Sequence, residues 1–214
     1  RGIEPFHSGS NSAAQEGFVH AAVAAYLADR KALDRSWDAF RTYACDPAAP
    51  RRGRIDLGKG VETGWSHDDA SPCAVNPKGT TKRVPRGRPG AGRTVRLDGA
   101  IINDMRRGGD YQWPPGFTQY PWVGLEGFVP AAVILHRSGY PAFDVADRAV
   151  LRTLEYLWYL RVQTGREVWF DGTRADEIVF LVNRAYGVSF PVVDVVRAGR
   201  LVGYTDWSHM TWRR

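Results

Sequence analysis

The segment NDMRRGGDYQWPPGFTQYPWVGLEGFVPAA, residues 103–132, joins cationic and aromatic side chains to the start of an apolar run. Arg106 and Arg107 carry guanidinium groups, whose planar donors match a carboxylate. Tyr120 stands where the apolar run begins as a predicted helix, and the positive end of the helix dipole there lowers the cost of phenolate character. These residue types together suit an anionic ligand that is held against a phenol.

Other side chains in the same segment suit a sugar. Trp113 and Trp122 offer flat apolar faces on which a sugar ring can stack, and Glu126 lies one helical turn beyond Trp122. A structural alternative stays open, in which Tyr120 and Trp122 are core anchors and the neighbouring arginines are solvated.

Histidine and amide side chains precede the first predicted helix. The stretch HSGSNSA puts His7 and Asn11 at or just before a helix N-terminus, which receives a carboxylate well because its first backbone N–H groups lack helical partners. The alternative is that Asn11 is only a helix N-cap. His67, in the loop sequence GWSHDDASPC, is a further candidate for substrate binding.

Two stretches near the C-terminus hold further candidates. LVNRAYGVSFP places Asn183 and Tyr186 at the end of a predicted helix, before a glycine, and YTDWSH groups Trp207 with His209. The sequence contains no Walker, GxGxxG, HExxH or GxSxG motif, so we expect neither a cofactor nor a metal.

The 214-residue chain carries a formal charge of +6, much of which comes from one basic stretch. No acidic residue lies between Asp69 and Asp98, and the basic residues there are Lys78, Lys82, Arg83, Arg86, Arg88, Arg93 and Arg96. Such a stretch attracts nucleic acid, acidic lipid or acidic polysaccharide, unless it is a solvated loop. Because no apolar stretch reaches membrane-spanning length, we expect no membrane partner.

The chain has two cysteines, Cys45 and Cys73, both in loop-like sequence. In an exported protein they would pair, and the chain-entropy model gives about 3–4 kcal/mol for a loop of that length. In a cytosolic protein they would be two free thiols. Neither cysteine shows the Cys/His spacing of a zinc site. We predict the disulfide, and with it a secreted or periplasmic protein.

Apolar residues at helical spacing predict helices over residues 12–28, 31–44, 122–138, 144–163 and 173–186. The first is apolar nearly all round, which favours burial on most sides. The first pair and the pair that follows residue 122 both read as a hydrophobic helix, a short turn and an amphipathic helix, which is weak internal repetition of a helical hairpin. No regular alternation supports a large sheet.

Residues 46–121 show little periodicity and are dense in Gly, Pro, Arg and aromatic residues, so we predict a long loop-rich insertion there. The chain can bury one sizeable core, and we predict a single domain over residues 1–214. Helical hairpins stacked side by side form a solenoid or close into a toroid. We therefore predict an all-α fold, a short (α/α) toroid of antiparallel helix hairpins with long loops, or an incomplete one that lacks an N-terminal part.

Several of these stretches together resemble the alginate-lyase-like polysaccharide lyases with an (α/α) toroid fold. They are SGSNSA with AAVAAYLADRKALDRSWDAFR, DGAIINDMRRGG with YPWVGLEGFVPAAVILHRSGYPAF, LVNRAYGVSFP with GYTDWSH, and the short pieces CDP and VNPKG. The similarity spans nearly the whole chain, and its most specific pieces are the Tyr-Trp helix entry and the YGVSFP and YTDWSH ending. Ser12 departs from the family pattern, which has a large aromatic residue or a histidine after the asparagine.

The resemblance implies β-elimination on a polyuronate such as alginate or glucuronan. It implies that Asn11, with Arg107 or Arg106, neutralises the uronate carboxylate. It also implies that Tyr120 removes the C5 proton as the base. In related lyases a tyrosine can also protonate the departing oxygen, when the proton and the leaving group lie on one face of the sugar.

The resemblance gives the remaining candidates supporting roles. His7 or His67 would replace or assist the tyrosine base. The residues expected to bind the polysaccharide are Arg106, Trp113, Trp122, Glu126, His67, Asn183, Tyr186, Trp207 and His209.

Other functions stay open on the sequence. A non-catalytic acidic-glycan-binding protein would keep the basic stretch and the aromatic residues but need no base. A nucleic-acid-binding protein would use the arginines, but we expect no nucleic-acid partner because the chain shows no nucleic-acid-binding module. A glycoside hydrolase would need two opposed carboxylates, for which Glu126 and Asp206 are available.

Overall fold

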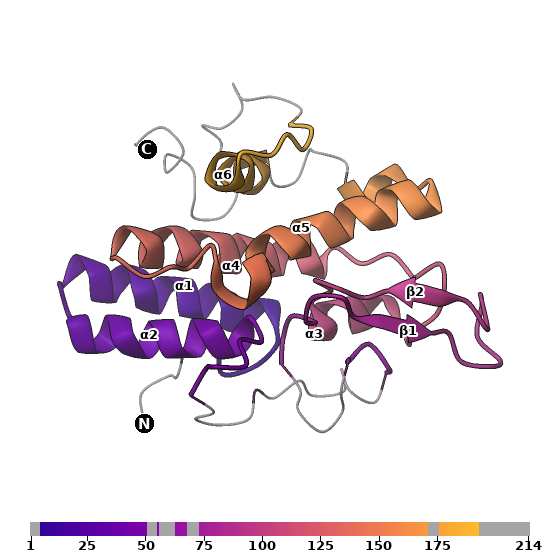
Figure 1. Cartoon of the computed structure of the whole chain (residues 1–214), viewed down its shortest axis with the longest axis horizontal. Helices are drawn as coiled ribbons and strands as arrows, with labels where there is room; N and C mark the ends of the chain where they lie inside the picture. Colours follow the sequence, from indigo (N-terminus) through magenta and orange to yellow (C-terminus); the bar gives the residue numbers. More distant parts are fainter. Residues whose placement is uncertain (1–4, 51–54, 56–62, 68–72, 171–175, 193–214) are drawn as a thin grey trace.

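The computed structural model of the chain is mainly helical (Figure 1). It describes residues 5–50, 55, 63–67, 73–170 and 176–192. Within these residues there are six α-helices, one two-stranded sheet and short 3-10 turns. The prediction of a mainly helical fold is confirmed, whereas closure into a toroid stays a prediction.

The first two helices form a hairpin whose N-termini are capped by side chains. α1 (Asn11–Tyr26) begins after Ser10, whose Oγ accepts a hydrogen bond of 3.2 Å from a first-turn backbone N–H. α2 (Arg30–Tyr43) begins after Asp29, whose Oδ1 accepts a similar bond of 2.9 Å. Ser10 and not Asn11 is therefore the N-cap of α1, and the Asn11 side chain is not used for capping.

The second hairpin consists of α4 (Tyr120–Arg137) and α5 (Val145–Thr164), which run in opposite directions (Figure 1). The first turn of α5 is left-handed, with φ between 49° and 60° at residues 146–148. α6 (Asp176–Tyr186) follows and is seen end-on above the hairpins in Figure 1, so it crosses them at a steep angle. Both helical hairpins predicted from the sequence are present.

α1 packs more extensively on α4 than on any other element, and the two helices run in the same direction. A Cβ atom on Gly127 of α4 would overlap the α1 backbone at Ala14 and Gln15. One turn earlier, a Cβ atom on Gly124 would lie 2.5 Å from Asp104 Oδ2, and the other oxygen of this carboxyl group accepts a bond from the first residue of α1. The two helices therefore begin at the same end of the molecule.

The predicted loop-rich insertion contains short regular elements. β1 (Thr81–Arg83) and β2 (Thr94–Arg96) pair as an antiparallel hairpin. α3 (Ile102–Met105) runs directly into the 3-10 turn η2 (Arg106–Gly108). A second 3-10 turn, η3 (Glu167–Phe170), follows α5. The all-α prediction missed the sheet because strands of 3 residues are too short to show an alternating pattern.

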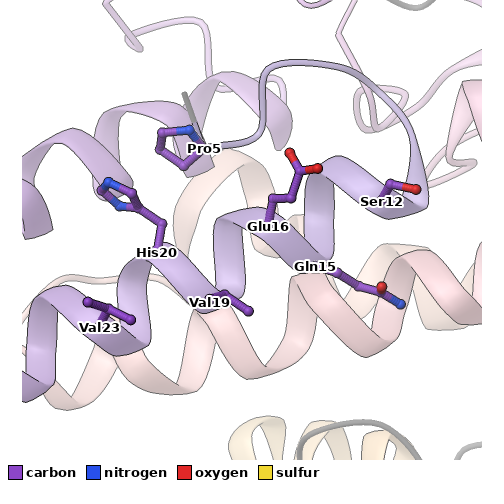
Figure 2. A pocket seen from close by; sticks show the side chains of 7 residues that line it. All are labelled: Pro5, Ser12, Gln15, Glu16, Val19, His20 and Val23. Carbon is purple, nitrogen blue, oxygen red and sulfur yellow. The ribbon is translucent and has the colours of Figure 1, made fainter. Parts of the chain in front are cut away.

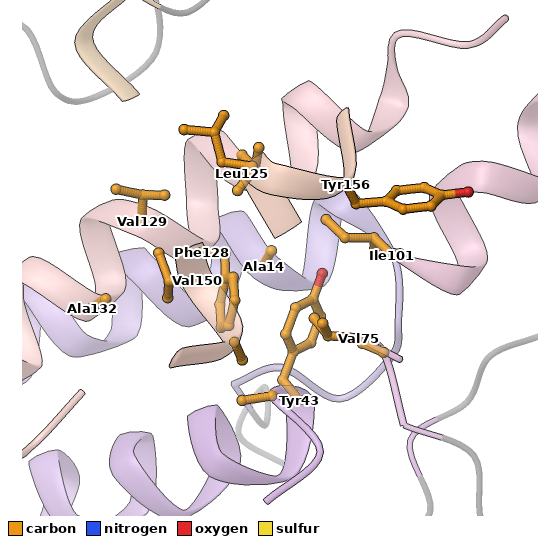
Figure 3. Packing of buried hydrophobic residues seen from close by; sticks show 14 of the residues in the cluster. Ala14, Tyr43, Val75, Ile101, Leu125, Phe128, Val129, Ala132, Val150 and Tyr156 are labelled. Atoms are coloured by element: carbon orange, nitrogen blue, oxygen red, sulfur yellow. The ribbon is translucent and has the colours of Figure 1, made fainter. Parts of the chain in front are cut away.

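One continuous cluster of buried apolar residues joins the two hairpins to the segment between them. Phe128 of α4 stacks on Phe40 of α2 with ring centroids 4.8 Å apart, and lies 5.1 Å from the ring of Tyr43. Val75 and Ile101 bring the long segment into the same cluster (Figure 3). The insertion is therefore part of the core and not an appendage to it.

The prediction that α1 is buried on most sides is wrong. Its buried side consists of Ala13, Ala14, Gly17, Phe18, Ala21 and Ala24. On its other side Val19, Val23 and Tyr26 are 46%, 51% and 89% exposed. The reason is that α1 packs mainly against α2 and α4, which cover one side of it.

Arg152 of α5 ties this hairpin to the long segment. The side chain is 5% exposed, and its Nη1 donates to Asp98 Oδ1 at 2.6 Å. The guanidinium also donates to the carbonyl oxygens of Asn76, Asp147 and Ala146, at 2.8, 3.0 and 2.8 Å. A buried guanidinium is tolerated when its donors are matched in this way, so the left-handed first turn of α5 and the segment near Asp98 are held together.

A disulfide joins Cys45 to Cys73, as predicted, across 28 positions with the Cα atoms 5.2 Å apart. Cys45 lies directly after α2, and Cys73 lies two residues before the β-bridge between Val75 and Ile101. The disulfide therefore fixes the part of the long segment around Cys73 against the end of α2.

We expect Arg152→Met to lower the free energy of unfolding by about 3–5 kcal/mol. The variant leaves the buried Asp98 carboxylate with only the longer contact to Arg96 Nη2, at 3.8 Å, and removes the donor to three carbonyl oxygens. The exposed pair of Lys78 and Asp147, with Nζ and Oδ1 3.4 Å apart, provides the control. Lys78→Met should change the same quantity by at most about 1 kcal/mol. Denaturant unfolding followed by circular dichroism measures both, and equal effects would contradict the central role given to Arg152.

Candidate functional site

A close backbone contact folds the loop before α4 back on itself. Gly108, at the end of η2, and Gly116 lie so close that a Cβ atom on either residue would overlap the carbonyl group of the other. A larger residue at either position would push the two sides of the loop apart. The contact brings η2 alongside the residues that lead into α4, and so carries Arg107 to the start of that helix.

Arg107 lies over the ring of Tyr120. Its guanidinium carbon is 5.1 Å from the ring centroid, within the range of a cation–π interaction. Tyr120 is the first residue of α4, and its backbone N–H donates to Thr118 Oγ1 at 3.3 Å. Tyr120 is 36% exposed and Arg107 is exposed. The structure thus brings two of the predicted catalytic residues together at a position open to solvent.

Asn11 lies at the same end of the molecule. It is the first residue of α1 and partly exposed, and its backbone N–H donates to Asp104 Oδ1 at 3.2 Å. Asp104 contacts Gly124, which lies one helical turn, about 6 Å, beyond Tyr120 along α4. Asn11, Arg107 and Tyr120 therefore border one region, where two parallel helices present their N-termini.

Asp104 is a member of this region that sequence reasoning missed. It is 1% exposed, and burial raises the pKa of its carboxyl group well above the usual range, against the opposing effects of the Asn11 N–H and the two arginines. Its Oδ2 has no hydrogen-bond partner among the described residues. The raised pKa favours the neutral acid, which opposes the charge of Arg106 and Arg107 less than a carboxylate would and so favours an anionic ligand. The only signal in the sequence is an acid two residues before the first arginine of the Arg pair, in DMRR.

The other two predicted polar residues of the site contact other partners. Arg106 Nε, at the start of η2, donates to Asn103 Oδ1 in α3. His7 Nδ1 lies 3.2 Å from Glu16 Oε2 on α1. His7 thus contacts α1, and a role of His7 in catalysis stays a prediction.

Trp113 and Trp122 are buried, so the prediction that they offer faces for a sugar ring is wrong. They are 5% and 6% exposed. Trp113 packs against Tyr159, with ring centroids 5.8 Å apart, and Trp122 Nε1 donates to the carbonyl oxygen of Trp169 at 3.1 Å. Their large apolar surfaces are used by the core, which was the alternative kept for Trp122.

Asn183 and Tyr186 make structural contacts in place of the predicted sugar contacts. Asn183 Nδ2 donates to the carbonyl oxygen of Phe190 at 2.8 Å, and its Oδ1 accepts from the N–H of the same residue at 2.9 Å. The Tyr186 hydroxyl donates to the carbonyl oxygen of Phe143 at 2.6 Å. These bonds use the polar atoms that a sugar would need. Glu126 is half-buried on α4.

His67 lies beside the disulfide. One of its ring nitrogens and the sulfur atoms of Cys45 and Cys73 all lie within 4.8 Å of one another. The predicted residues Trp207 and His209 lie outside the described residues. The structure therefore gathers His67 with the two cysteines.

A groove of about 480 Å³ runs along the exposed side of α1 (Figure 2). Its lining residues are Pro5, Ser12, Gln15, Glu16, Val19, His20 and Val23. This lining is largely apolar and its one carboxylate, on Glu16, would repel a polyuronate. Neither Arg107 nor Tyr120 contributes to it. The groove is therefore separate from the candidate site, although it begins next to Asn11.

Carboxylates pair with part of the basic stretch. Lys78 Nζ lies 3.4 Å from Asp147 Oδ1, and Arg96 Nη2 lies 3.2 Å from Glu155 Oε2. Lys82 Nζ instead donates to two loop carbonyl oxygens, at 2.7 and 3.1 Å. The stretch is thus anchored to the fold through several of its charges, which weakens its attraction for a polyanion.

No protein-family model, curated protein or solved structure matches the chain. Among the described residues, none of the helices combines the length and apolarity needed to cross a membrane. The functional inference therefore rests on the chemistry of the site, together with the sequence resemblance, and not on the fold.

Asp104→Asn tests the protonation of the buried carboxyl group. The asparagine side chain keeps an oxygen that can accept the bond from the Asn11 N–H, but the side chain does not ionise. In the unfolded chain Asp104 has the usual carboxyl pKa and loses its proton above it, whereas the raised pKa of the folded protein keeps the proton to higher pH. The free energy of unfolding of the wild type therefore falls as the pH rises from the usual pKa towards the raised one. We expect the free energy of unfolding of the variant, relative to wild type, to increase as the pH rises above about 4, the usual pKa of an aspartic acid. Urea unfolding at several pH values measures this, and a constant difference would show that Asp104 is ionised.

Proposed function

We propose that the protein is a polysaccharide lyase that cleaves an acidic, uronic-acid-containing polysaccharide, such as alginate or glucuronan, by β-elimination. The observation that carries the proposal is the solvent-facing contact of Arg107 with Tyr120, at the end of the molecule where α1 and α4 both begin. The resemblance of the sequence to alginate-lyase-like enzymes supports the same class.

The first chemical task is to neutralise the uronate carboxylate. The C5 hydrogen is weakly acidic because its removal would place a second negative charge next to the carboxylate. Fixed donors that hold the carboxylate lower the free energy of this charged transition state. Arg107 offers a guanidinium and Asn11 offers an amide, with Arg106 in the same turn as Arg107. A protonated Asp104 beneath them does not compete for these donors.

The second task is to move one proton. The phenolate oxygen of Tyr120 takes the C5 proton, and the electron pair of the C–H bond forms the C4–C5 double bond as the glycosidic C4–O bond breaks. The departing oxygen then takes the proton from the Tyr120 hydroxyl, which returns the residue to phenolate. The guanidinium of Arg107 over the ring stabilises the negative charge on the phenolate. His7 is the second candidate for the base.

The setting of the proposed enzyme follows from the disulfide. Disulfides such as Cys45–Cys73 are typical of exported proteins, and we propose that the protein acts outside the cytosol, as a secreted or periplasmic enzyme. We further propose that the hairpins α1–α2 and α4–α5 belong to a short or incomplete (α/α) toroid, with the site at the rim where α1 and α4 start.

A non-catalytic acidic-glycan-binding protein is the second candidate. The pairing of Arg107 with Tyr120 would also hold a carboxylate without turnover. The burial of Trp113 and Trp122 removes aromatic faces that both candidates would use. We favour catalysis because a solvent-facing phenol beside a cation is a feature that the lyase needs and a binding protein does not. Nucleic-acid binding is disfavoured by the carboxylates that pair with the basic stretch.

We expect Tyr120→Phe to lower the rate of elimination by about 10²–10⁴-fold, because it removes the hydroxyl that moves the proton and keeps the ring. The assay is the rise in ultraviolet absorbance from unsaturated uronate products, over a panel of defined polyuronates. Tyr26→Phe is the matched control, because Tyr26 is 89% exposed at the far end of α1 and should keep the wild-type rate.

The same panel separates the two candidates. If the wild-type protein gives no unsaturated product but binds a polyuronate, it is a binding protein. If Tyr120→Phe keeps the full rate, Tyr120 is not the base.

We expect Arg107→Met to lower kcat/KM by about 10²–10³-fold, because the carboxylate loses a fixed cation in the transition state. Arg107→Lys should recover part of the loss, since it restores the charge but not the planar fork. Arg137→Met is the control, because Arg137 is exposed at the opposite end of α4. Initial rates on the preferred polyuronate measure all three variants, and equal losses in Arg107→Met and Arg137→Met would point to a general loss of positive charge.

A further inference from the structure

A second cluster of reactive side chains surrounds the disulfide. The Sγ atoms of Cys45 and Cys73 and a ring nitrogen of His67 all lie within 4.8 Å of one another. Cys45 and His67 are half-buried, and Cys73 is 5% exposed. Two sulfurs and an imidazole are the ligands that Zn²⁺ prefers in proteins. The partial exposure gives an ion access to the cluster from solvent.

Backbone hydrogen bonding keeps the two cysteines near each other without help from the S–S bond. The N–H of Val75, two residues after Cys73, donates at 3.2 Å to the carbonyl oxygen of Tyr43, two residues before Cys45. Val75 also forms the β-bridge with Ile101. The two sulfur-bearing segments are thus fixed to each other by contacts that reduction leaves intact.

The third member of the cluster is held by a buried amide. Asn76 Oδ1 accepts the backbone N–H of His67 at 2.9 Å, and Asn76 Nδ2 donates to the carbonyl oxygen of Trp65 at 3.0 Å. Asn76 is fully buried, and its own carbonyl oxygen accepts from Arg152 at 2.8 Å. The backbone at His67 is therefore fixed by the same contacts that hold α5.

We propose that reduction of the Cys45–Cys73 disulfide converts this cluster into a binding site for a thiophilic divalent metal ion, with Zn²⁺ as the preferred ion. The two thiolates and the imidazole of His67 are the ligands. Tetrahedral Zn²⁺, with bonds of about 2.3 Å to sulfur and about 2.0 Å to nitrogen, needs its ligand atoms about 3.3–3.8 Å apart. The two sulfurs, which are bonded to each other in the oxidised chain, must therefore separate by about 2 Å after reduction. The imidazole nitrogen already lies within 4.8 Å of both sulfurs, and water completes the coordination.

The chemistry balances with an external dithiol as the reductant. Its two thiols are oxidised to a disulfide as the S–S bond of the protein breaks, and the two cysteines become thiols. Zn²⁺ then displaces the two thiol protons as two Zn–S bonds form. The same position is thus cross-linked by a disulfide when oxidised and by a metal when reduced. This proposal does not rest on the proposed lyase function.

The test uses Co²⁺ as a spectroscopic probe on the full chain. The protein is reduced with a dithiol, the dithiol is removed without oxygen, and Co²⁺ is added. We expect stoichiometric binding with thiolate-to-cobalt charge-transfer absorbance and the ligand-field bands of a tetrahedral site, both abolished by Zn²⁺. The oxidised chain should show neither signal. A reduced chain without charge-transfer absorbance would overturn the proposal.

Variants assign the ligands. His67→Ala should weaken binding of Zn²⁺ to the reduced chain by about tenfold or more, whereas His136→Ala, at an exposed histidine on α4, should not. The double variant Cys45→Ser, Cys73→Ser should lose the charge-transfer absorbance. Equal affinity of His67→Ala and wild type would overturn the assignment of His67.

Reduction of the disulfide could unfold part of the chain, so the helix content of the same samples is followed by circular dichroism. A reduced chain that loses helix should regain it when Zn²⁺ is added, because binding to the folded state stabilises that state. Failure of Zn²⁺ to restore the helix signal, or to raise the melting temperature of a reduced chain that stays folded, would count against a site formed by the folded protein.

Discussion

The buried contact between Arg152 and Asp98 is the constraint on which the rest of the structure depends. One guanidinium binds this carboxylate together with the carbonyl groups of the first turn of α5 and of Asn76. Because an unmatched charge in the interior is costly, the long segment between the hairpins must return to α5 at one place. Gly99 completes the contact, because its backbone lies so close to the backbone of Arg152 that a side chain would not fit. The long segment between the hairpins shows little periodicity in its sequence, and its position is fixed by this one polar centre together with the apolar core.

The candidate site is a consequence of how α1 and α4 pack. Gly127 lets the two helices approach closely and in parallel, so that Asn11 and Tyr120 both stand at helix N-termini at one end of the molecule. The field of two helix dipoles and the charge of Arg107 act on the same region. Asp104 would oppose this field if ionised, but burial raises its pKa and so favours the neutral acid, which accepts the first N–H of α1 and opposes the positive charge less than a carboxylate would.

The helices and the disulfide could be predicted because their causes are local or involve very few residues. Helical spacing of apolar residues gave α1 as 12–28, against the observed Asn11–Tyr26. The pairing of Arg107 with Tyr120 was not predicted as a contact, although both residues were singled out for their chemistry. The burial of Trp113 could not be foreseen, since an aromatic side chain serves a core and a sugar equally well. Asp104 was missed because its raised pKa arises from residues distant in sequence that enclose it.

The disulfide and the amide of Asn76 have a consequence for how the chain can vary. They fix Cys45 against Cys73 and the backbone at Trp65 against Asn76. Between these anchor points Ile55 is buried in the core, 5% exposed. The entropy of closing a segment grows by only about 0.6 kcal/mol for each doubling of its length, so the length itself costs less than the loss of an anchor. A change in length on either side of Ile55 is therefore tolerated as long as Cys45, Ile55 and Trp65 keep their places.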